Sequence, residues 1–213
     1  MPLMKLILAS ASPRRAEILR NAGIPFEVRA VLFDESRRPG ELRADYVRRV
    51  ALGKARAAAN EFGDSGDCLF IGADTVVVAD DQILGKPSSE SDARRMLQLL
   101  SGKTHDVHSG LAVVHSIGAS KGSPGGAAAA SGGAEGVIDE ITRVTFAALS
   151  DEEIDSYIAT GEPFDKAGAY AIQGIAGRYI TRIEGCYFNV VGLPLARLWS
   201  LLRDFGWRHA PKG

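Results

Sequence analysis

Asp74 is a charged residue in a stretch that otherwise has the composition of a buried strand. It lies within residues 68–79, a nearly continuous apolar run. An ionised carboxylate is costly to bury unless it is paired, hydrogen-bonded or bound to a metal. An aspartate that caps a neighbouring loop at a strand end is the plainer alternative. The apolar surroundings favour a functional carboxylate over this alternative.

A second group of chemically capable side chains surrounds a predicted helix start. Ser12 and Pro13 have the pattern of an N-cap and a first helical residue. The partial positive charge of a helix N-terminus disfavours cations there, yet Arg14 and Arg15 follow at once. Ser10 adds a hydroxyl to the turn before this helix. The turn, the helix start and the two guanidiniums together predict an anion-binding site. A solvated arginine pair is the alternative.

Three further cationic positions are ambiguous from sequence alone. Lys54 falls on the apolar face of a predicted helix over 44–62, where it either snorkels at the edge of that face or points into a cleft. Lys86 and the pair Asp165 and Lys166 stand beside glycines. Both segments add charged residues to the candidate functional groups, and for either an ordinary solvated turn is the alternative.

Regular elements that would position these residues are predicted along the whole chain. Alternation of strands and helices, with two hairpins, predicts an α/β or α+β fold around a mixed sheet. A turn is expected at Asp80 and Asp81, and the Gly-, Ala- and Ser-rich stretch 116–135 is expected to be a flexible excursion from a hairpin. Strands are expected at 4–9, 25–32, 68–79, 105–115, 136–149 and 178–184, and helices at 12–22, 44–62, 89–100, 150–159 and 193–205.

Two histidines on one predicted strand do not form a metal site. His105 and His108 are three residues apart, so their side chains face opposite sides of the strand. We expect both to have structural roles.

Composition limits the classes of function. The 213 residues, 46% hydrophobic and 24% charged, fit a single domain over 1–213. A net charge of -1 gives no general basic field for nucleic acid. Cys68 and Cys186 lack the spacing of a zinc site or a disulfide scaffold. No apolar run approaches the roughly 20 residues of a membrane span, and no signal peptide is recognised. We therefore expect a cytoplasmic protein that binds neither nucleic acid nor membrane.

The motifs together resemble the Maf family of nucleoside triphosphate pyrophosphatases. They occur in family order and cover nearly the whole chain, and 116–135 departs from the family by being longer and richer in Gly and Ala. The matching segments are LASASPRR at 8–15, DES at 34–36, YVRRVALGKA at 46–55, ADTVV at 73–77, GKP at 85–87, SGKTH at 101–105, GEPFDKAG at 161–168 and GCYFNVVGLP at 185–194.

The resemblance implies a two-lobed fold like that of the inosine-triphosphatase group, with a central cleft beside a mixed sheet. It implies hydrolysis of a nucleoside triphosphate between the α and β phosphates, giving a monophosphate and pyrophosphate. Asp74 would be the proton acceptor, and Glu35 and Asp74 would hold Mg²⁺ or Mn²⁺. The residues it assigns to substrate binding are Ser10, Arg14, Arg15, Glu35, Lys54, Thr75, Lys86, Asp165, Lys166 and Gln173.

Base preference is implied by the segment YAIQG at 170–174, which looks like the branch of the family that acts on dTTP and UTP. By resemblance, Arg14, Thr75 and Gln173 are linked to specificity, and a Gln side chain offers a donor and an acceptor to the imide edge of uracil or thymine. The sister branch, which prefers 7-methyl-GTP, is one alternative. A septum or cell-division regulatory protein is another. The resemblance is also compatible with a homodimer.

Overall fold

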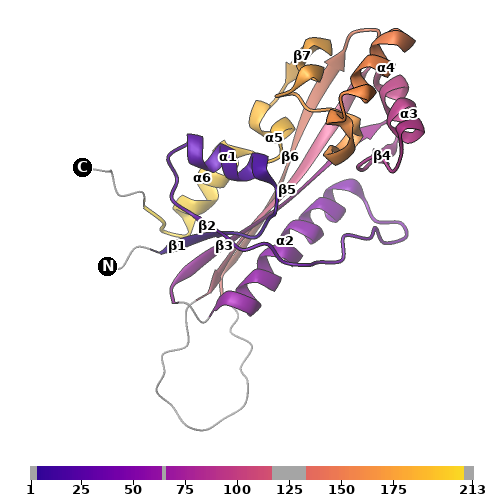
Figure 1. Ribbon diagram of the computed structural model, residues 1–213. Helices are drawn as coiled ribbons and strands as arrows, with labels where there is room; N and C mark the ends of the chain where they lie inside the picture. The colour runs from indigo at the N-terminus through magenta and orange to yellow at the C-terminus, as the bar shows by residue number, and fades with distance from the viewer. Residues whose placement is uncertain (1–3, 64–65, 117–132, 209–213) are drawn as a thin grey trace, which may run out of the picture.

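One mixed sheet runs through the molecule, with the strand order β2-β1-β3-β5-β6-β7 and β4 paired to β3 outside that path (Figure 1). The computed structural model describes residues 4–63, 66–116 and 133–208. β1 pairs in parallel with both β2 and β3, and the other pairings are antiparallel. The strands are β1 (Lys5–Leu8), β2 (Glu27–Val28), β3 (Cys68–Ala79), β4 (Gln82–Leu84), β5 (Thr104–Ser116), β6 (Glu135–Phe146) and β7 (Ile180–Glu184).

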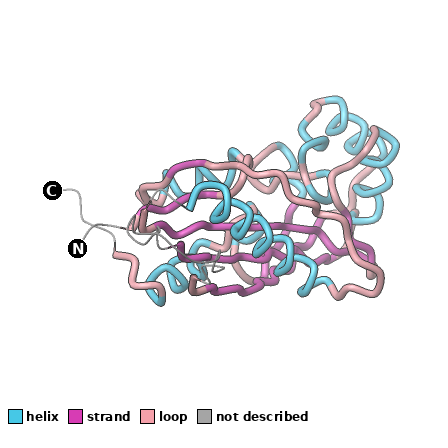
Figure 2. Tube along the Cα trace, turned by 90° about the horizontal axis from the view of Figure 1, so that it is seen from below, coloured by secondary structure: helices cyan, strands magenta, loops and turns pink. Residues whose placement is uncertain are grey.

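Helices cover both faces of this sheet because alternate residues of β3 point in opposite directions. Phe70 packs toward α2 (Arg43–Phe62), whereas Ile71 packs toward α1 (Pro13–Asn21) and α6 (Leu195–Asp204). Figure 2 shows the strands running along the length of the molecule among these helices. α2 lies unusually close to the sheet at Gly72, where a Cβ atom would come 2.0 Å from a carbonyl oxygen of the helix.

Most of the apolar core lies in two regions, here called the first and second lobes, and a smaller cluster packs α2 on Val76 and Val78 of β3. The first lobe packs β1, α1, α2 and α6 on the leading half of β3. The second lobe packs β4, α3 (Glu90–Leu100) and α4 (Asp151–Ala159) with 3-10 helices on the other end of the long strands. These 3-10 helices are η2 (Glu162–Asp165), η3 (Ala167–Ala169) and η4 (Ile175–Tyr179).

A gap in the sheet lies between the lobes. β1 pairs with β3 only as far as Ile71, and β4 pairs with the same strand from Val77 onward. Within the described part of the chain, no strand covers the edge of β3 over 72–76 between these two pairings. Asp74 and Thr75 are therefore presented at an open sheet edge, on opposite faces of one strand.

The predicted mixed α/β fold is confirmed, and several boundaries are corrected. The strand predicted over 25–32 is wrong in extent, because only Glu27–Val28 pair with β1. β6 ends at Phe146 rather than 149, next to a register shift against β7. A short helix, α5 (Tyr187–Val191), and β4 were not predicted.

Other sequence predictions hold or lie outside the structure. The turn at Asp80 and Asp81 is present, with positive φ angles of 44° and 63°. The segment expected to be a flexible excursion falls mostly on 117–132, outside the described residues, while β5 and β6 on either side of it pair as a hairpin. Among the described helices, none combines the length and hydropathy needed to cross a bilayer.

Candidate active site

A cleft of about 510 Å³ opens at the uncovered edge of β3, between the two lobes. Its size suits a nucleotide-sized ligand. The structure brings every side chain that the sequence nominated to the walls of this one cleft: Ser10, Arg14, Arg15, Glu35, Lys54, Asp74, Thr75, Lys86, Asp165, Lys166 and Gln173.

Asp74, Lys54 and Glu35 form a charged cluster on the α2 side of the sheet. Asp74 and Lys54 are only 6% and 8% exposed, and Lys54 Nζ lies 3.0 Å from Asp74 Oδ1. The same ammonium lies 2.8 Å from Glu35 Oε1, whose side chain is 54% exposed. Lys54 therefore points into the cleft rather than snorkelling to the surface. Asp74 is a buried, paired carboxylate rather than a loop cap.

Glu35 belongs to the segment 29–42, here called the strap, which is fastened to α2. Tyr46 donates a hydrogen bond to the Glu35 carbonyl oxygen at 3.0 Å. Arg49, one turn further along, donates to the Ser36 carbonyl oxygen at 2.9 Å and pairs with Glu41. Burial, with the negative charges of Asp74 and Glu35, raises the pKa of Tyr46 to about 12, so its hydroxyl remains a neutral donor.

Arg15 organises the opposite side of the cleft. Its guanidinium donates to Ser10 Oγ at 3.1 Å, to Thr75 Oγ1 at 3.3 Å and to the Gly192 carbonyl oxygen at 2.8 Å. Burial lowers the pKa of Arg15, and the carboxylate of Asp74 opposes that shift. Ser12 caps α1, as predicted. The helix start, the turn before it and the edge of β3 are thus joined through one side chain.

Two polar residues behind Thr75 were not found from sequence. Ser109 Oγ on β5 lies 2.8 Å from Thr75 Oγ1 and donates to the Asn189 carbonyl oxygen at 3.4 Å. Asn189 is fully buried and donates to the Val107 carbonyl oxygen at 3.0 Å. Asn189 stood in a matching motif, but neither its type nor its spacing indicates that it supports a threonine 114 positions earlier.

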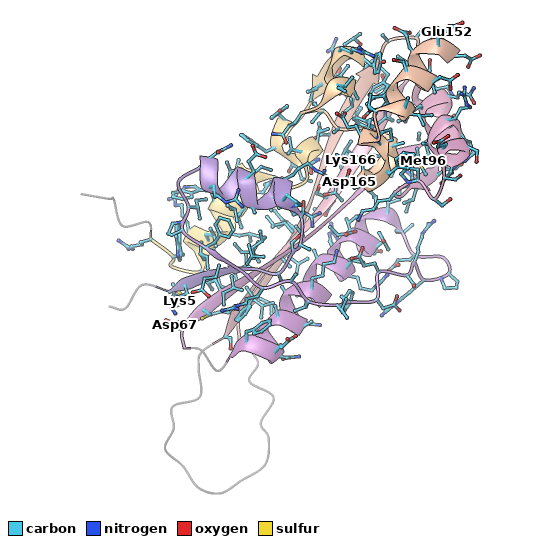
Figure 3. The ribbon with its side chains drawn as sticks, in the orientation of Figure 1. Lys5, Asp67, Met96, Glu152, Asp165 and Lys166 are labelled. Atoms are coloured by element: carbon cyan, nitrogen blue, oxygen red, sulfur yellow. The ribbon has the colours of Figure 1, made fainter. Side chains whose placement is uncertain are left out.

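The second lobe supplies the far wall of the cleft. Arg14 Nη1 reaches across to Asp165 Oδ2 at 3.1 Å, and Asp165 also contacts Lys166. Burial acts to raise the pKa of Asp165, but the contacts with Lys166 and Arg14 together lower it. Figure 3 labels Asp165 and Lys166 where the second lobe faces α1. Within the described chain, the exposed side chain of Lys86 has no ion-pair partner.

Gln173 lies on the loop between Tyr170 and η4. Its side chain is exposed and, among the described residues, makes no hydrogen bond. The loop turns through a bond from the Gly174 N–H to the Ala171 carbonyl oxygen at 3.0 Å. Upstream, the buried Tyr170 hydroxyl lies 2.8 Å from His105 Nε2. The amide of Gln173 is therefore available to a ligand, on a loop whose base is fixed.

These groups together can bind a polyphosphate. Several cations face a cleft that also holds the carboxylates of Glu35, Asp74 and Asp165, and charge-assisted hydrogen bonds to phosphate are among the stronger ones in proteins. No cluster of three or more His, Cys, Asp or Glu suited to a metal occurs in the described residues. Magnesium commonly uses one or two carboxylates together with substrate phosphates, so Glu35 and Asp74 fit that requirement.

Comparisons with known proteins place the chain among related sequences. A family model described as "Maf-like protein" matches residues 5–205. A dTTP/UTP pyrophosphatase of Koribacter versatilis (strain Ellin345) is 48% identical, covering 95% of each chain. One from Moorella thermoacetica is 47% identical over 96% of each chain, and one from Geotalea uraniireducens is 49% identical over 94% of this chain and 95% of that protein.

A solved structure, a nucleoside-triphosphatase / dITP/XTP pyrophosphatase from Mycobacterium abscessus, also matches. It is 15% identical, with a TM-score of 0.38, and the match covers 74% of this chain and 95% of that one. A likeness of that size indicates neither the substrate nor the site residues of this chain.

Proposed function

The chain belongs to the Maf family, and from that premise we propose that it hydrolyses dTTP and UTP to the monophosphate and pyrophosphate, removing these nucleotides from the cellular pool. The proposal is supported by the names of relatives 47–49% identical over nearly the full chain. The observation that carries it is the buried Asp74 carboxylate, held by Lys54 at the open edge of β3 inside a cation-lined cleft.

The reaction needs a water positioned for in-line attack on the α phosphorus. Lys54 donates a hydrogen bond to Oδ1 of Asp74. Oδ2 accepts no hydrogen bond from any described residue. Asp74 Oδ2 is then the atom that accepts a proton from the water. Arg14 and Lys86 stabilise the growing negative charge on the leaving pyrophosphate, while Ser10 donates a hydrogen bond to the triphosphate.

A divalent cation, Mg²⁺ or Mn²⁺, completes the proposal, with Glu35 and Asp74 as its protein ligands. Such an ion supplies charge neutralisation of the phosphates and polarises a bound oxygen. Glu35→Gln keeps the shape of the side chain and removes one anionic ligand. We expect the Mg²⁺ concentration for half-maximal activity to rise on the order of ten-fold in this variant. An unchanged magnesium titration would remove Glu35 from the metal site.

The side-chain amide of Gln173 is the group that we propose to select the nucleobase. Its amide can accept from N3–H of uracil or thymine and donate to a neighbouring carbonyl. Cytosine reverses both polarities, which leaves polar groups unpaired, and sites built on such hydrogen bonds discriminate strongly. We therefore expect dTTP and UTP to outcompete dCTP and GTP.

Chromatography of products from dTTP, UTP, dCTP, GTP and 7-methyl-GTP, each with Mg²⁺ or Mn²⁺, tests the proposal. Monophosphate and pyrophosphate from dTTP and UTP, at kcat/KM well above the other substrates, are the expected result. Release of orthophosphate would contradict the cleavage site. A preference for 7-methyl-GTP would assign the chain to the sister activity. Absence of any turnover would favour a regulatory binding protein.

We also propose that the protein acts in the cytoplasm. Cys68 and Cys186 are both free thiols, as expected in the reducing cytoplasm, where nucleotide pools are held. We propose the nucleoside triphosphate as the partner of the cleft.

A further inference from the structure

Glu162 is a half-buried carboxylate that makes no ion pair with any described residue, and the catalytic steps above do not use it. It opens η2, four residues before Lys166, whose ammonium donates to the Glu162 carbonyl oxygen at 3.4 Å. The side chain accepts hydrogen bonds from the start of η4, which directly follows the loop that carries Gln173. Its environment consists of hydrogen-bond donors from two other parts of the second lobe.

Three donors converge on this carboxylate. The Tyr157 hydroxyl donates to Oε1 at 2.8 Å, the Ile175 N–H donates to Oε2 at 3.0 Å, and the Ala176 N–H donates to Oε1 at 3.4 Å. Burial and the bond to Glu162 raise the pKa of Tyr157, so the phenol stays a donor. Hydrogen bonds to a charged acceptor are roughly twice as strong as neutral ones, and two of these fix the backbone just after Gln173.

The carboxylate also lies directly against residue 174. A Cβ atom at Gly174 would come 2.3 Å from either Glu162 oxygen, which is closer than any side chain permits. The residue next to Gln173 is thus pressed against Glu162, while the other end of the loop is held by the buried Tyr170 bonded to His105. A loop held at both ends keeps the backbone of Gln173 at one place in the cleft wall.

We propose that Glu162 is a positioning residue for base selection, which holds the backbone of the Gln173 loop so that the Gln173 amide meets the edge of the base. This inference rests on the proposed function and deepens it by naming what fixes the specificity loop. Glu162 touches neither the phosphates nor the reacting water in this role. Its loss should therefore change discrimination between bases more than turnover.

Glu162→Gln tests the role, with Glu61→Gln, an exposed glutamate near the end of α2, as the matched control. The amide keeps the size of the carboxylate but turns one acceptor into a donor, which leaves a backbone N–H without its partner. We expect the ratio of kcat/KM for dTTP to that for dCTP to fall about ten-fold in Glu162→Gln, mostly through KM for dTTP. The control should keep the wild-type ratio.

Each outcome decides the question. A folded Glu162→Gln protein, verified by circular dichroism, that keeps the wild-type ratio would overturn the proposal, as would an equal loss of kcat on both nucleotides. If Glu162→Gln fails to fold, Gly174→Ala replaces it, because the added methyl group displaces the carboxylate from the other side. In Gly174→Ala, a similar fall in the ratio of kcat/KM for dTTP to that for dCTP supports the proposal, and an unchanged ratio overturns it.

The wild-type protein separates this inference from the proposed function. If it prefers another base, the ratio is taken for that base against dCTP. If it hydrolyses no nucleotide at all, the proposed function fails and this role fails with it. A wild type that prefers dTTP, with an unaltered ratio in both variants, rejects only the role of Glu162.

Discussion

Asp74 and Lys54 face each other from β3 and α2 and are both nearly inaccessible to solvent. The pair remains compatible with catalysis because, among the described residues, only one oxygen of the Asp74 carboxylate accepts a hydrogen bond. The ammonium is shared with Glu35 on the strap. One cation thus holds two carboxylates from different elements at the same point in the cleft. If either Asp74 or Glu35 loses its charge, Lys54 still has the other carboxylate as an ion-pair partner.

Asp74→Asn should abolish hydrolysis while leaving the fold intact, because the amide keeps the shape and can still accept from Lys54. Loss of a general base typically lowers kcat by about 10²–10⁴-fold. Steady-state kinetics with dTTP checks the loss, and circular dichroism checks the fold. Asp106→Asn, on β5 outside the cleft, is the matched control and should retain activity. A folded Asp74→Asn enzyme with more than about a tenth of normal kcat would argue against Asp74 as the base.

The strap shows how an element without regular secondary structure can place a functional residue. It has no strand or helix of its own between β2 and α2, so its conformation depends on contacts with α2. Arg49 makes two of these, a two-pronged pair with Glu41 and a hydrogen bond to the Ser36 carbonyl oxygen. The pairing with Arg49 lowers the pKa of Glu41 to about 2, so it stays charged throughout the physiological range.

Arg49→Lys should loosen the strap, since an ammonium cannot reproduce the two-pronged geometry of a guanidinium. We expect kcat/KM for dTTP to fall about five- to ten-fold through misplacement of Glu35. Arg56→Lys is the matched control, because Arg56, about two turns further along α2, makes the same kind of pair with Glu135. Equal effects of the two substitutions on kcat/KM would show that the strap does not position Glu35.

Elements with a regular apolar pattern were predictable from the sequence, and those held by tertiary contacts were not. α2 and β3 have clear periodicity or a long apolar run, and both match the prediction closely. The 3-10 helices η2, η3 and η4 are too short to have a periodic apolar pattern in the sequence. Their conformation depends on tertiary contacts such as those of Glu162. The sequence also marked Lys54 as unusual, but it left the direction of the side chain undecided until Asp74 was placed opposite.

At the scale of the whole molecule, the second lobe has a buried histidine that links its stability to pH. His105 is 3% exposed and packs edge-on against Phe146 and Tyr170. Burial lowers the pKa of His105 to about 4. Both predicted structural histidines are buried, and burial lowers the pKa of His108 as well. The unfolded chain therefore binds protons more readily than the folded protein at mildly acidic pH.

The free energy of unfolding should consequently fall as the pH drops from 7 toward 4. A histidine with pKa values of about 6.5 unfolded and about 4 folded contributes stability above pH 6.5. About 2 kcal/mol of this is lost between pH 7 and pH 5. Urea titrations at both pH values measure the change. His105→Gln should be less stable at pH 7 but lose about 2 kcal/mol less between the two pH values. An identical pH dependence in the variant would contradict this origin.

The long strands affect how the protein unfolds and how its backbone amides exchange with solvent. β3 and β5 each pass through both lobes and pair continuously from Cys68 to Val78. Because both lobes share this ladder, we expect the amides that bond between β3 and β5 in the middle of these strands to exchange with solvent only when the whole domain unfolds. The strap and the Gln173 loop are outside that shared ladder and can exchange through local openings. Asp74, the proposed proton acceptor, thus lies in the ladder that we expect to exchange most slowly. Glu35, proposed to share the metal with Asp74, and Gln173, proposed to bind the nucleobase, lie on segments that we expect to exchange faster.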